Sequence, residues 1–163
     1  MKRAAFAVVC LLLLLGPRSI QAQQAVYVVR HAERLDQTAD SLLSPAGISR
    51  SQKLRDTLRD AGITHIFTTD LRRTIDTAKP LAEALKVTPQ ALPAADVAAL
   101  ASRLASLGAH DRALVVGHSN TVPQILRALR VDTAVVINDS DYDNLFIVVP
   151  AKASAPPLLR LKF

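Results

Sequence analysis

The residues best suited to chemistry in this chain lie where three apolar segments end. The three groups are Arg30-His31, Thr68-Thr69-Asp70 followed by Arg72-Arg73, and Gly117-His118-Ser119-Asn120. Each group follows a short run of apolar and β-branched residues that is typical of a buried strand. In a parallel sheet the carboxyl ends of the strands meet at one edge, and ligands bind in the crevice outside it. We therefore expect two histidines and two or three arginines to converge at that edge.

Arginines that converge in a crevice indicate an anion site, because cations repel one another unless an anion binds between them. The planar guanidinium group matches phosphate, to which it donates two parallel charge-assisted hydrogen bonds. The helix that begins near Ser119 would add backbone N–H donors and the positive end of its dipole. Gly117 would let the backbone approach the ligand closely. The convergence predicts a phosphate site, although any one of these residues alone would be weak support.

Two histidines at a phosphate site indicate phosphoryl transfer. A neutral imidazole is a competent nucleophile near pH 7. Neighbouring arginines should lower its pKa, while its other nitrogen donates to a backbone carbonyl and fixes the tautomer. The second histidine would donate a hydrogen bond to the phosphoryl oxygens. This chemistry needs no metal and no other cofactor, which agrees with the lack of a carboxylate cluster near the motifs.

Strands and helices alternate along the sequence. Strands are expected at Ala25 to Val29, Ile63 to Thr68, Ala113 to Val116, Val135 to Ile137, Leu145 to Val149 and Leu158 to Leu161. Helices are expected from the Ser44 N-cap to the Gly62 stop, from Leu71 to Leu85, from Val97 to Leu107, and from the GHSNTVP motif to Leu129. This alternation predicts an α/β domain with three layers and a mostly parallel sheet.

Prolines mark the irregular segments of this pattern. Pro80 falls inside the second helix and predicts a kink or an early break there. Residues 87 to 95, which include Pro89 and Pro93, are expected to form a loop. The last two strands are expected to pair as a C-terminal hairpin.

The first 22 residues have the pattern of a cleaved secretory signal peptide. Lys2 and Arg3 precede an apolar run of about a dozen residues, which is too short to span a bilayer, and cleavage is expected after Ala22. Residues 23–163 would then form one domain that is periplasmic or secreted and not held at a membrane. Cys10, the only cysteine, would leave with the signal, which excludes thiol chemistry and disulfides.

The charge of the remaining chain is modest. The whole sequence carries 20 basic and 14 acidic residues, but three of the basic residues lie in the signal, so the mature excess is three. No run of five lysines or arginines occurs, and there is no tryptophan. Nucleic-acid binding is therefore not expected.

The motifs together resemble the histidine phosphatase superfamily, the phosphoglycerate mutase-like clan. RHAER at a strand end, LSPAG at the start of a helix, TTDLRRTIDTA and GHSNTVP follow the order of that family over nearly the whole mature chain. The resemblance implies a phosphoglycerate mutase-like fold in a short, exported bacterial member. It implies that His31 is the nucleophile, that Arg30 and Arg73 bind the phosphoryl group, and that His118 stabilises the transition state. Thr69 stands at the position of the family's serine.

Other positions agree less closely with the family pattern. Ser119 and Asn120 would shape the rim of the substrate pocket, whereas Arg72 is expected to be solvated. Ala32 stands where glycine is commoner, and Thr74 stands where alanine is usual. Both departures are small.

The motifs do not identify the residue that acts as proton donor. Family members usually supply a carboxylate from the region between the arginine helix and the last histidine strand. Asp96 is the best candidate there, although it is equally suited to cap the helix that starts at Val97. Glu33, two residues from His31, is the alternative.

These residues predict a metal-independent phosphatase that hydrolyses phosphomonoesters, phosphoproteins or phosphoanhydrides through a phosphohistidine. The partner would be a phosphorylated small molecule or a phosphoprotein, since a chain this short leaves the pocket open. A non-catalytic phosphate-binding module and a mutase-type phosphotransferase are the alternatives. His65 and His110 are expected to be structural, and the sequence does not set the oligomeric state.

Overall fold

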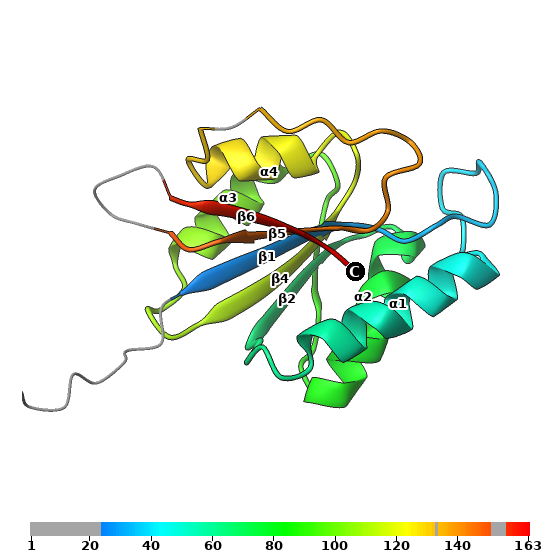
Figure 1. The fold of residues 1–163 in the computed structure, drawn as a ribbon, viewed down its shortest axis with the longest axis horizontal. Coiled ribbons are helices and arrows are strands. Elements are labelled where there is room, and N and C mark those ends of the chain that lie inside the picture. The colour runs from blue at the N-terminus through cyan, green and yellow to red at the C-terminus, as the bar shows by residue number, and fades with distance from the viewer. Residues whose placement is uncertain (1–23, 133, 151–155) are drawn as a thin grey trace, which may run out of the picture.

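A computed structural model describes residues 24–132, 134–150 and 156–163, which form one six-stranded sheet with helices on both faces (Figure 1). The strands are β1 (Ala25–Arg30), β2 (His65–Thr69), β3 (Gln90–Leu92), β4 (Arg112–Gly117), β5 (Asn144–Val148) and β6 (Leu158–Lys162). Their order across the sheet is β3-β2-β4-β1-β5-β6. The pairs among β1, β2, β3 and β4 are parallel, and both pairs made by β5 are antiparallel. The predicted α/β fold and the C-terminal hairpin are thus confirmed.

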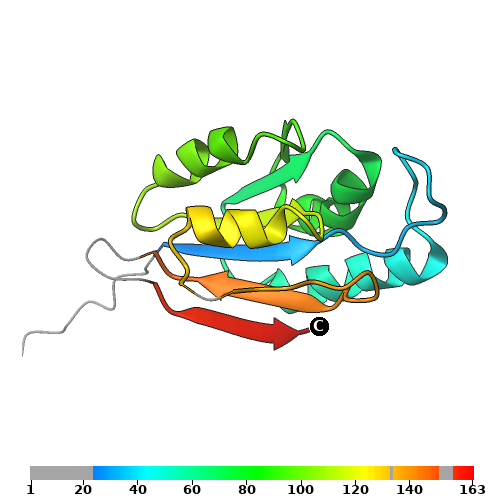
Figure 2. The same ribbon diagram turned by 90° about the horizontal axis from the view of Figure 1, so that it is seen from above.

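The helices form the outer two of three layers. They are α1 (Pro45–Leu58), α2 (Arg72–Leu85), α3 (Val97–Ala105) and α4 (Val122–Ala128). The first two lie together on one face of the sheet and the last two on the other (Figures 1 and 2). The predicted signal peptide and Cys10 lie outside the described residues. Within the described residues, no helix has the length and apolar character needed to cross a bilayer.

Alternating side chains of the strands fill two separate cores. In β1, Val28 packs toward α3 and α4, whereas the next residue, Val29, packs toward α1 and α2. Both are fully buried. Parallel pairing with β4 sets Val28 opposite Val115 and Arg30 opposite Gly117 and so defines the register of β1. The same register fixes which residue emerges at the end of the strand.

The helix boundaries follow their capping residues. Ser44 accepts a hydrogen bond from the backbone nitrogen of Gly47 at 3.1 Å, and Pro45 occupies the first turn of α1, as the sequence predicts. Gly62, the expected stop, lies beyond the end of α1 with a φ of +70°, a conformation that favours glycine.

Three local predictions were wrong. Residues 87–95 are not all loop, because Gln90–Leu92 pairs with β2 as the edge strand β3. Val135 to Ile137 forms no strand, because β3 and β6 already occupy the two edges of the sheet. α2 continues through Pro80 to Leu85, held to the sheet by the buried Leu81 and its neighbours, so the early break that Pro80 predicts does not occur, whereas the kink stays a prediction.

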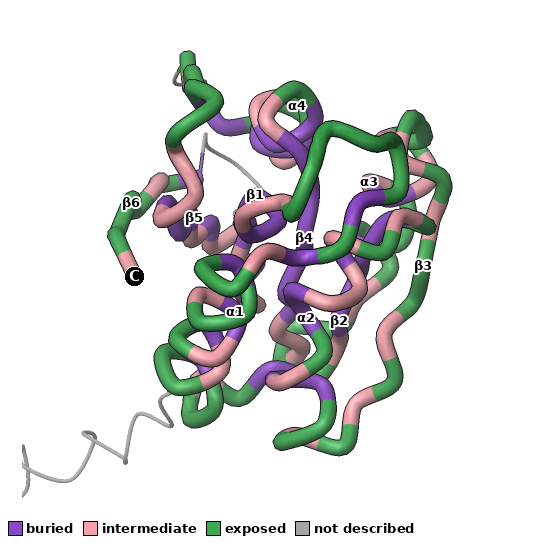
Figure 3. The backbone as a smooth tube through the Cα atoms, turned by 90° about the vertical axis from the view of Figure 1, so that its right-hand side faces the viewer, coloured by how far each residue is buried: buried purple, intermediate pink, exposed green. Residues whose placement is uncertain are grey.

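Figure 3 looks onto the edge of the sheet where the parallel strands end. Backbone coloured as buried reaches this edge along the central strands, while the outer sides of the helices are exposed. Arg30 and His31 are only 4% exposed, and His118 is 7% exposed. The fold therefore buries polar and charged groups at the one edge where the sequence predicts a ligand.

The contact between α1 and the segment after His31 leaves no room for a side chain at Gly47. A Cβ atom at this position would lie 2.3 Å from the carbonyl oxygen of Glu33. We expect Gly47→Ala to lower the free energy of unfolding by about 1–3 kcal/mol, because backbone must move to relieve the clash. Denaturant unfolding measures this change. Gly108→Ala is the control, since its Cβ would meet only the side chain of Asp111; equal losses in the two variants would contradict the steric explanation.

Candidate active site

The register of β1 against β4 brings the two histidines together. Arg30 pairs with Gly117, and the backbone nitrogen of His31 donates to the carbonyl of Gly117 at 2.9 Å. The rings of His31 and His118 follow directly, with centroids 5.3 Å apart and planes inclined at 58°. The strand ends thus place two buried imidazoles side by side, as the sequence predicts.

One ring nitrogen of His31 forms a hydrogen bond, and the other is available as a nucleophile. Its Nδ1 lies 2.7 Å from the carbonyl oxygen of Ala32, so Nδ1–H is the donor and Nε2 carries a lone pair. The backbone nitrogen of Ala32 is in turn held by the hydroxyl of Thr77 at 2.9 Å. Burial lowers the pKa of His31 from 6.5 to about 3; the bond to Ala32 opposes the shift, and nearby positive groups add to it. The imidazole is therefore neutral and nucleophilic at neutral pH.

His118 is held from three sides. Its Nε2 lies 3.2 Å from the hydroxyl of Thr69, and a guanidinium nitrogen of Arg73 lies 3.3 Å from its Nδ1. Its backbone nitrogen donates to the hydroxyl of Thr121 at 2.9 Å. Since arginine only donates, Nδ1 accepts and the proton resides on Nε2. Burial, followed by the charges of Arg73 and Arg30, lowers the pKa of His118 to about 4.

Arg30 is buried and held by one loop. Its Nη1 donates to the carbonyl oxygens of Asn138 and Asp139, at 2.9 and 3.0 Å. The ring of Tyr142 covers the guanidinium, with the Cζ atom of Arg30 4.1 Å from the ring centroid. Its Nε is buried and has no partner among the described residues. This leaves a donor that a ligand can satisfy.

Arg73, in the first turn of α2, repeats this arrangement. Its Nη1 donates to the carbonyl of Ala39, its Nη2 contacts His118, and its buried Nε has no described partner. Burial, with the charge of Arg34, lowers the pKa of Arg73, but an arginine remains a cation at neutral pH. Arg72 is exposed, as expected. The site therefore presents two cations, the buried Arg30 and the half-buried Arg73, each with a buried Nε–H that has no described partner.

A carboxylate from a distant loop caps the helix that carries Arg73. The N-cap residue of α2, Leu71, offers no side-chain hydrogen bond. Asp40 accepts from the backbone nitrogen of Arg72 at 2.8 Å instead. Ala39, next to Asp40, holds the guanidinium of Arg73. One loop therefore fixes both the first turn of α2 and its functional side chain.

The two candidate proton donors have different environments. Glu33 forms a bidentate ion pair with Arg50, with the shortest contact 2.6 Å. Partial burial raises the pKa of Glu33, but the hydrogen bonds and charge of Arg50 outweigh it and hold the pKa below its usual range. This disfavours Glu33 as a proton donor at neutral pH.

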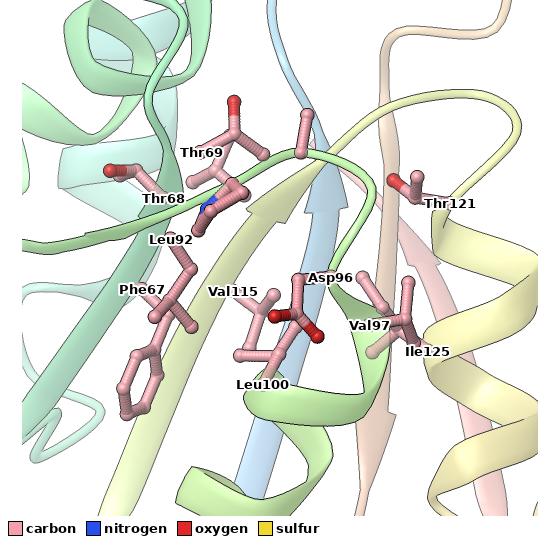
Figure 4. Close-up of a pocket in the computed structure, with 13 residues that line it drawn as sticks. Phe67, Thr68, Thr69, Leu92, Asp96, Val97, Leu100, Val115, Thr121 and Ile125 are labelled. Atoms are coloured by element: carbon pink, nitrogen blue, oxygen red, sulfur yellow. The ribbon is translucent and has the colours of Figure 1, made fainter.

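Asp96 caps α3 and also faces a cleft. Its Oδ1 accepts from the backbone nitrogen of Ala99 at 2.8 Å, as the capping alternative predicts. The cleft has an empty volume of about 320 Å³, open to solvent, and lies between α3, α4 and the strand ends (Figure 4). Thr69 and Thr121, which both bond to His118, line the same cleft. Asp96 therefore lines the same cleft as the two threonines that form hydrogen bonds with His118.

The rim residues and the glycine differ in their roles. Ser119 is half-buried and Asn120 is exposed, beside the histidines at the end of β4. A Cβ at Gly117 would lie 3.0 Å from the hydroxyl of Thr121 and 3.3 Å from Ile125. Gly117 thus allows α4 to pack against the strand end, and the expected close approach to a ligand is not needed to explain it. α4 itself begins only at Val122.

Sequence reasoning missed Tyr142 and Asp40. Both lie in irregular segments that follow no helical or strand period, so no pattern connects them to the motifs. His65, expected to be structural, lies at the start of β2, where its Nδ1 is 2.8 Å from the hydroxyl of Thr64. In the part of the chain that the structure describes, no three histidines, cysteines or carboxylates cluster as metal ligands would.

The lowered pKa values make stability depend on pH. An unfolded chain protonates its histidines below about pH 6.5, whereas His31 and His118 stay neutral in the fold down to about pH 4. Protons are thus taken up on unfolding, so stability is full above about pH 6.5 and falls as the pH decreases. Each histidine contributes a slope of about 1.4 kcal/mol per pH unit. Denaturant unfolding at about pH 5 to 7.5 measures this slope; His118→Asn should remove about half of it, and an unchanged slope would contradict the burial argument.

Asp40→Ala should loosen the first turn of α2. We expect the loss of the cap to lower the free energy of unfolding by about 1 kcal/mol and to weaken orthophosphate binding through Arg73. Asp40→Asn, which keeps an oxygen for the Arg72 nitrogen, should restore most of both. Thermal unfolding and calorimetric titration with phosphate measure the two effects. Unchanged phosphate affinity in Asp40→Ala would show that the loop does not position Arg73.

Comparison with known sequences shows that part of the chain is similar to a known family. The sequence model of the histidine phosphatase superfamily (branch 1) matches residues 26–96. Probable phosphoglycerate mutase GpmB of Proteus mirabilis is 34% identical over 99 residues, which cover 54% of this chain and 46% of that protein. Its counterpart in Yersinia pestis is 40% identical over 70 residues, 39% of this chain and 33% of that protein. The matched segment thus spans less than half the length of these curated relatives.

Comparison with solved structures establishes the fold. The protein histidine phosphatase SixA complexed with tungstate superposes with a TM-score of 0.69 at 18% identity, covering 85% of this chain and 96% of that chain. A mycobacterial glucosyl-3-phosphoglycerate phosphatase gives 0.66 at 13% identity, covering 87% and 98%. A putative alpha-ribazole-5'-P phosphatase from Escherichia coli gives 0.70 at 14% identity, covering 86% and 97%. The match to the family model over residues 26–96 and the fold shared with these phosphatases make the chain similar to the histidine phosphatase superfamily.

Proposed function

We propose that this protein is a phosphatase that transfers a phosphoryl group from its substrate to His31 and then to water. One observation carries the proposal: the buried Arg30 and the half-buried Arg73 each have a buried Nε–H without a described partner, beside an imidazole whose Nε2 is available. Buried donors without partners are costly, so such a pair indicates a ligand with several acceptor oxygens. A phosphoryl group supplies three such oxygens.

In the first step the lone pair on Nε2 of His31 attacks phosphorus. An N–P bond forms, and the bond from phosphorus to the leaving oxygen breaks. Arg30 and Arg73 stabilise the charge that spreads over the equatorial oxygens, and the Nε2–H of His118, which points to Thr69 in this structure, would turn to a phosphoryl oxygen as a further donor. The Nδ1–H bond to Ala32 stabilises the positive charge that develops on the His31 ring. These steps use only residues of this chain.

In the second step water attacks the phosphohistidine. An O–P bond forms, the N–P bond breaks, and the water proton leaves as orthophosphate is released and neutral His31 is regenerated. We assign the proton transfer in both steps to Asp96, whose Oδ2 has no described partner while Oδ1 caps α3. Glu33 is the weaker assignment because Arg50 holds it as a carboxylate.

The access to the site favours a phosphoprotein or another large phosphorylated substrate. Only β3, α3 and short connections lie between α2 and β4, so no inserted domain covers the strand ends. The fold is shared with SixA, itself a protein histidine phosphatase. A second candidate is a phosphotransferase that returns the phosphoryl group to an organic acceptor, because the curated relatives are probable phosphoglycerate mutases.

The proposed location is the periplasm or the outside of the cell. Residues 1–22, with Lys2 and Arg3 before the apolar run, support export and cleavage after Ala22. An exported enzyme would meet phosphorylated molecules outside the cytoplasm. Mass spectrometry of the protein purified from the producing cells identifies the mature N-terminus directly.

His31→Ala should abolish phosphate release. We expect at least about a 1,000-fold loss in kcat/KM with p-nitrophenyl phosphate, because no other nucleophile can form the N–P bond. Phosphate release is measured on the purified protein with and without a chelator, and chelation should have no effect.

His65→Ala is the matched control and should stay within a few-fold of wild type, since His65 lies at the opposite end of β2. Full activity of His31→Ala would refute the mechanism. A wild-type protein that binds orthophosphate yet releases none from any phosphoester or phosphoprotein tested would favour a binding module instead. Transfer to an organic acceptor without free phosphate would favour the mutase-type reaction.

A further inference from the structure

One turn, from Asn138 to Tyr142, makes every described hydrogen bond and ring contact of the Arg30 side chain. Two backbone carbonyls, those of Asn138 and Asp139, accept from Nη1. The ring of Tyr142 lies against the flat face of the guanidinium, at 4.1 Å. A buried arginine is usually paired with a carboxylate, but no ion pair of Arg30 occurs among the described residues. Its charge is instead compensated by carbonyl dipoles and an aromatic face.

The turn has its own internal support. Asp141 accepts from both the backbone nitrogen and the side-chain amide of Asn138, at 2.9 and 3.0 Å, through its Oδ2. The backbone nitrogen of Asp141 donates back to the carbonyl of Asn138 at 3.0 Å. These bonds hold the Asn138 carbonyl in place toward Arg30, independently of any ligand.

The contacts determine which edge of the guanidinium is free. Nη1 is occupied by the two carbonyls, and one face is occupied by the ring of Tyr142. Nε is buried without a partner, so the open edge is the one that carries Nε and Nη2. That edge presents two parallel N–H donors, the geometry in which arginine binds phosphate best.

The same ring stands next to the nucleophile. Its centroid lies 6.1 Å from that of His31, with the planes inclined at 59°. Tyr142 therefore borders both the group that binds the phosphoryl oxygens and the group that attacks phosphorus. A shift of the ring would change the angle between these two groups.

We propose that Tyr142 is a positioning residue, whose ring holds the guanidinium of Arg30 so that its Nε–Nη2 edge faces the phosphoryl group bound at His31. This inference rests on the proposed function in assigning Arg30 to the phosphoryl oxygens. Cation–π contact with a desolvated guanidinium orients the group without neutralising it, as a carboxylate would. The site thereby keeps its full positive charge for the substrate.

The test is the affinity of the full chain for sodium tungstate, an oxyanion with the shape of phosphate, measured by calorimetry. Tyr142→Leu should weaken tungstate binding about tenfold, because the face contact is lost. Tyr142→Phe, which keeps the ring, should restore most of that affinity. With a phosphoester substrate, Tyr142→Leu should raise KM more than it lowers kcat, since Arg30 holds the phosphoryl group in the ground state as well.

A second variant tests the turn from Asn138 to Tyr142 and leaves the ring of Tyr142 unchanged. Asp141→Ala removes the support of Asn138 and should weaken tungstate binding in the same direction, with a smaller change. Thermal unfolding of each variant checks that it is folded. Wild-type tungstate affinity in a folded Tyr142→Leu protein would overturn the proposal, as would a Tyr142→Phe variant as weak as Tyr142→Leu.

Tungstate binding separates this inference from the catalytic one. A wild-type protein that binds tungstate but turns over no phosphoester would refute the phosphatase and leave the role of Tyr142 testable by affinity. A wild-type protein that does not bind tungstate would overturn the phosphate site and this inference with it.

Discussion

Two cations beside two neutral imidazoles are the interaction on which the site depends. Arg30 is buried and Arg73 is half-buried, the Nε atom of each is shielded from solvent, and both charges lower the pKa of His118. Such a group is tolerated only if fixed dipoles or a counterion compensate it. The carbonyls of the two loops supply the dipoles in this structure, and an oxyanion would supply the counterion. Burial is the main cause of the lowered histidine pKa values, and the arginine charges that attract the anion add to it.

The sheet makes this arrangement possible by its register. Pairing of Arg30 with Gly117 sets His31 and His118 at equivalent heights, and apolar cores on both faces of β1 hold the strand in the sheet. α2 then brings Arg73 to the same edge, with its first turn capped by Asp40. The chemistry is therefore carried by strand ends and loops, while two apolar cores hold their relative positions. This division is typical of α/β proteins.

The sequence predicts those parts of the structure that depend on a local periodic pattern or a short motif. Strand ends, caps such as Ser44 and the convergence of the two histidines were predicted, because each depends on a periodic pattern or a short motif. The edge strand β3 was missed, since Pro89 and Pro93 flank it and its pairing with β2 depends on distant residues. Tyr142 was missed because its contact with Arg30 joins segments more than 100 residues apart. Asp96 caps α3, as one of its two alternatives predicts, and it also lines a cleft, whereas its role as proton donor stays a prediction.

Arg30 and Arg73 donate hydrogen bonds to main-chain carbonyl oxygens, those of Ala39, Asn138 and Asp139. Every amino acid has such an oxygen. The side chains of Ala39 and Asp139 therefore matter little to these hydrogen bonds, whereas Asn138 also supports its turn through its side-chain amide. Positions of the two loops that make no supporting contact can change, and with them the surface shape and charge around a constant centre. Substitutions at the rim of the site can therefore change which substrate is accepted while the two arginines continue to bind the phosphoryl group.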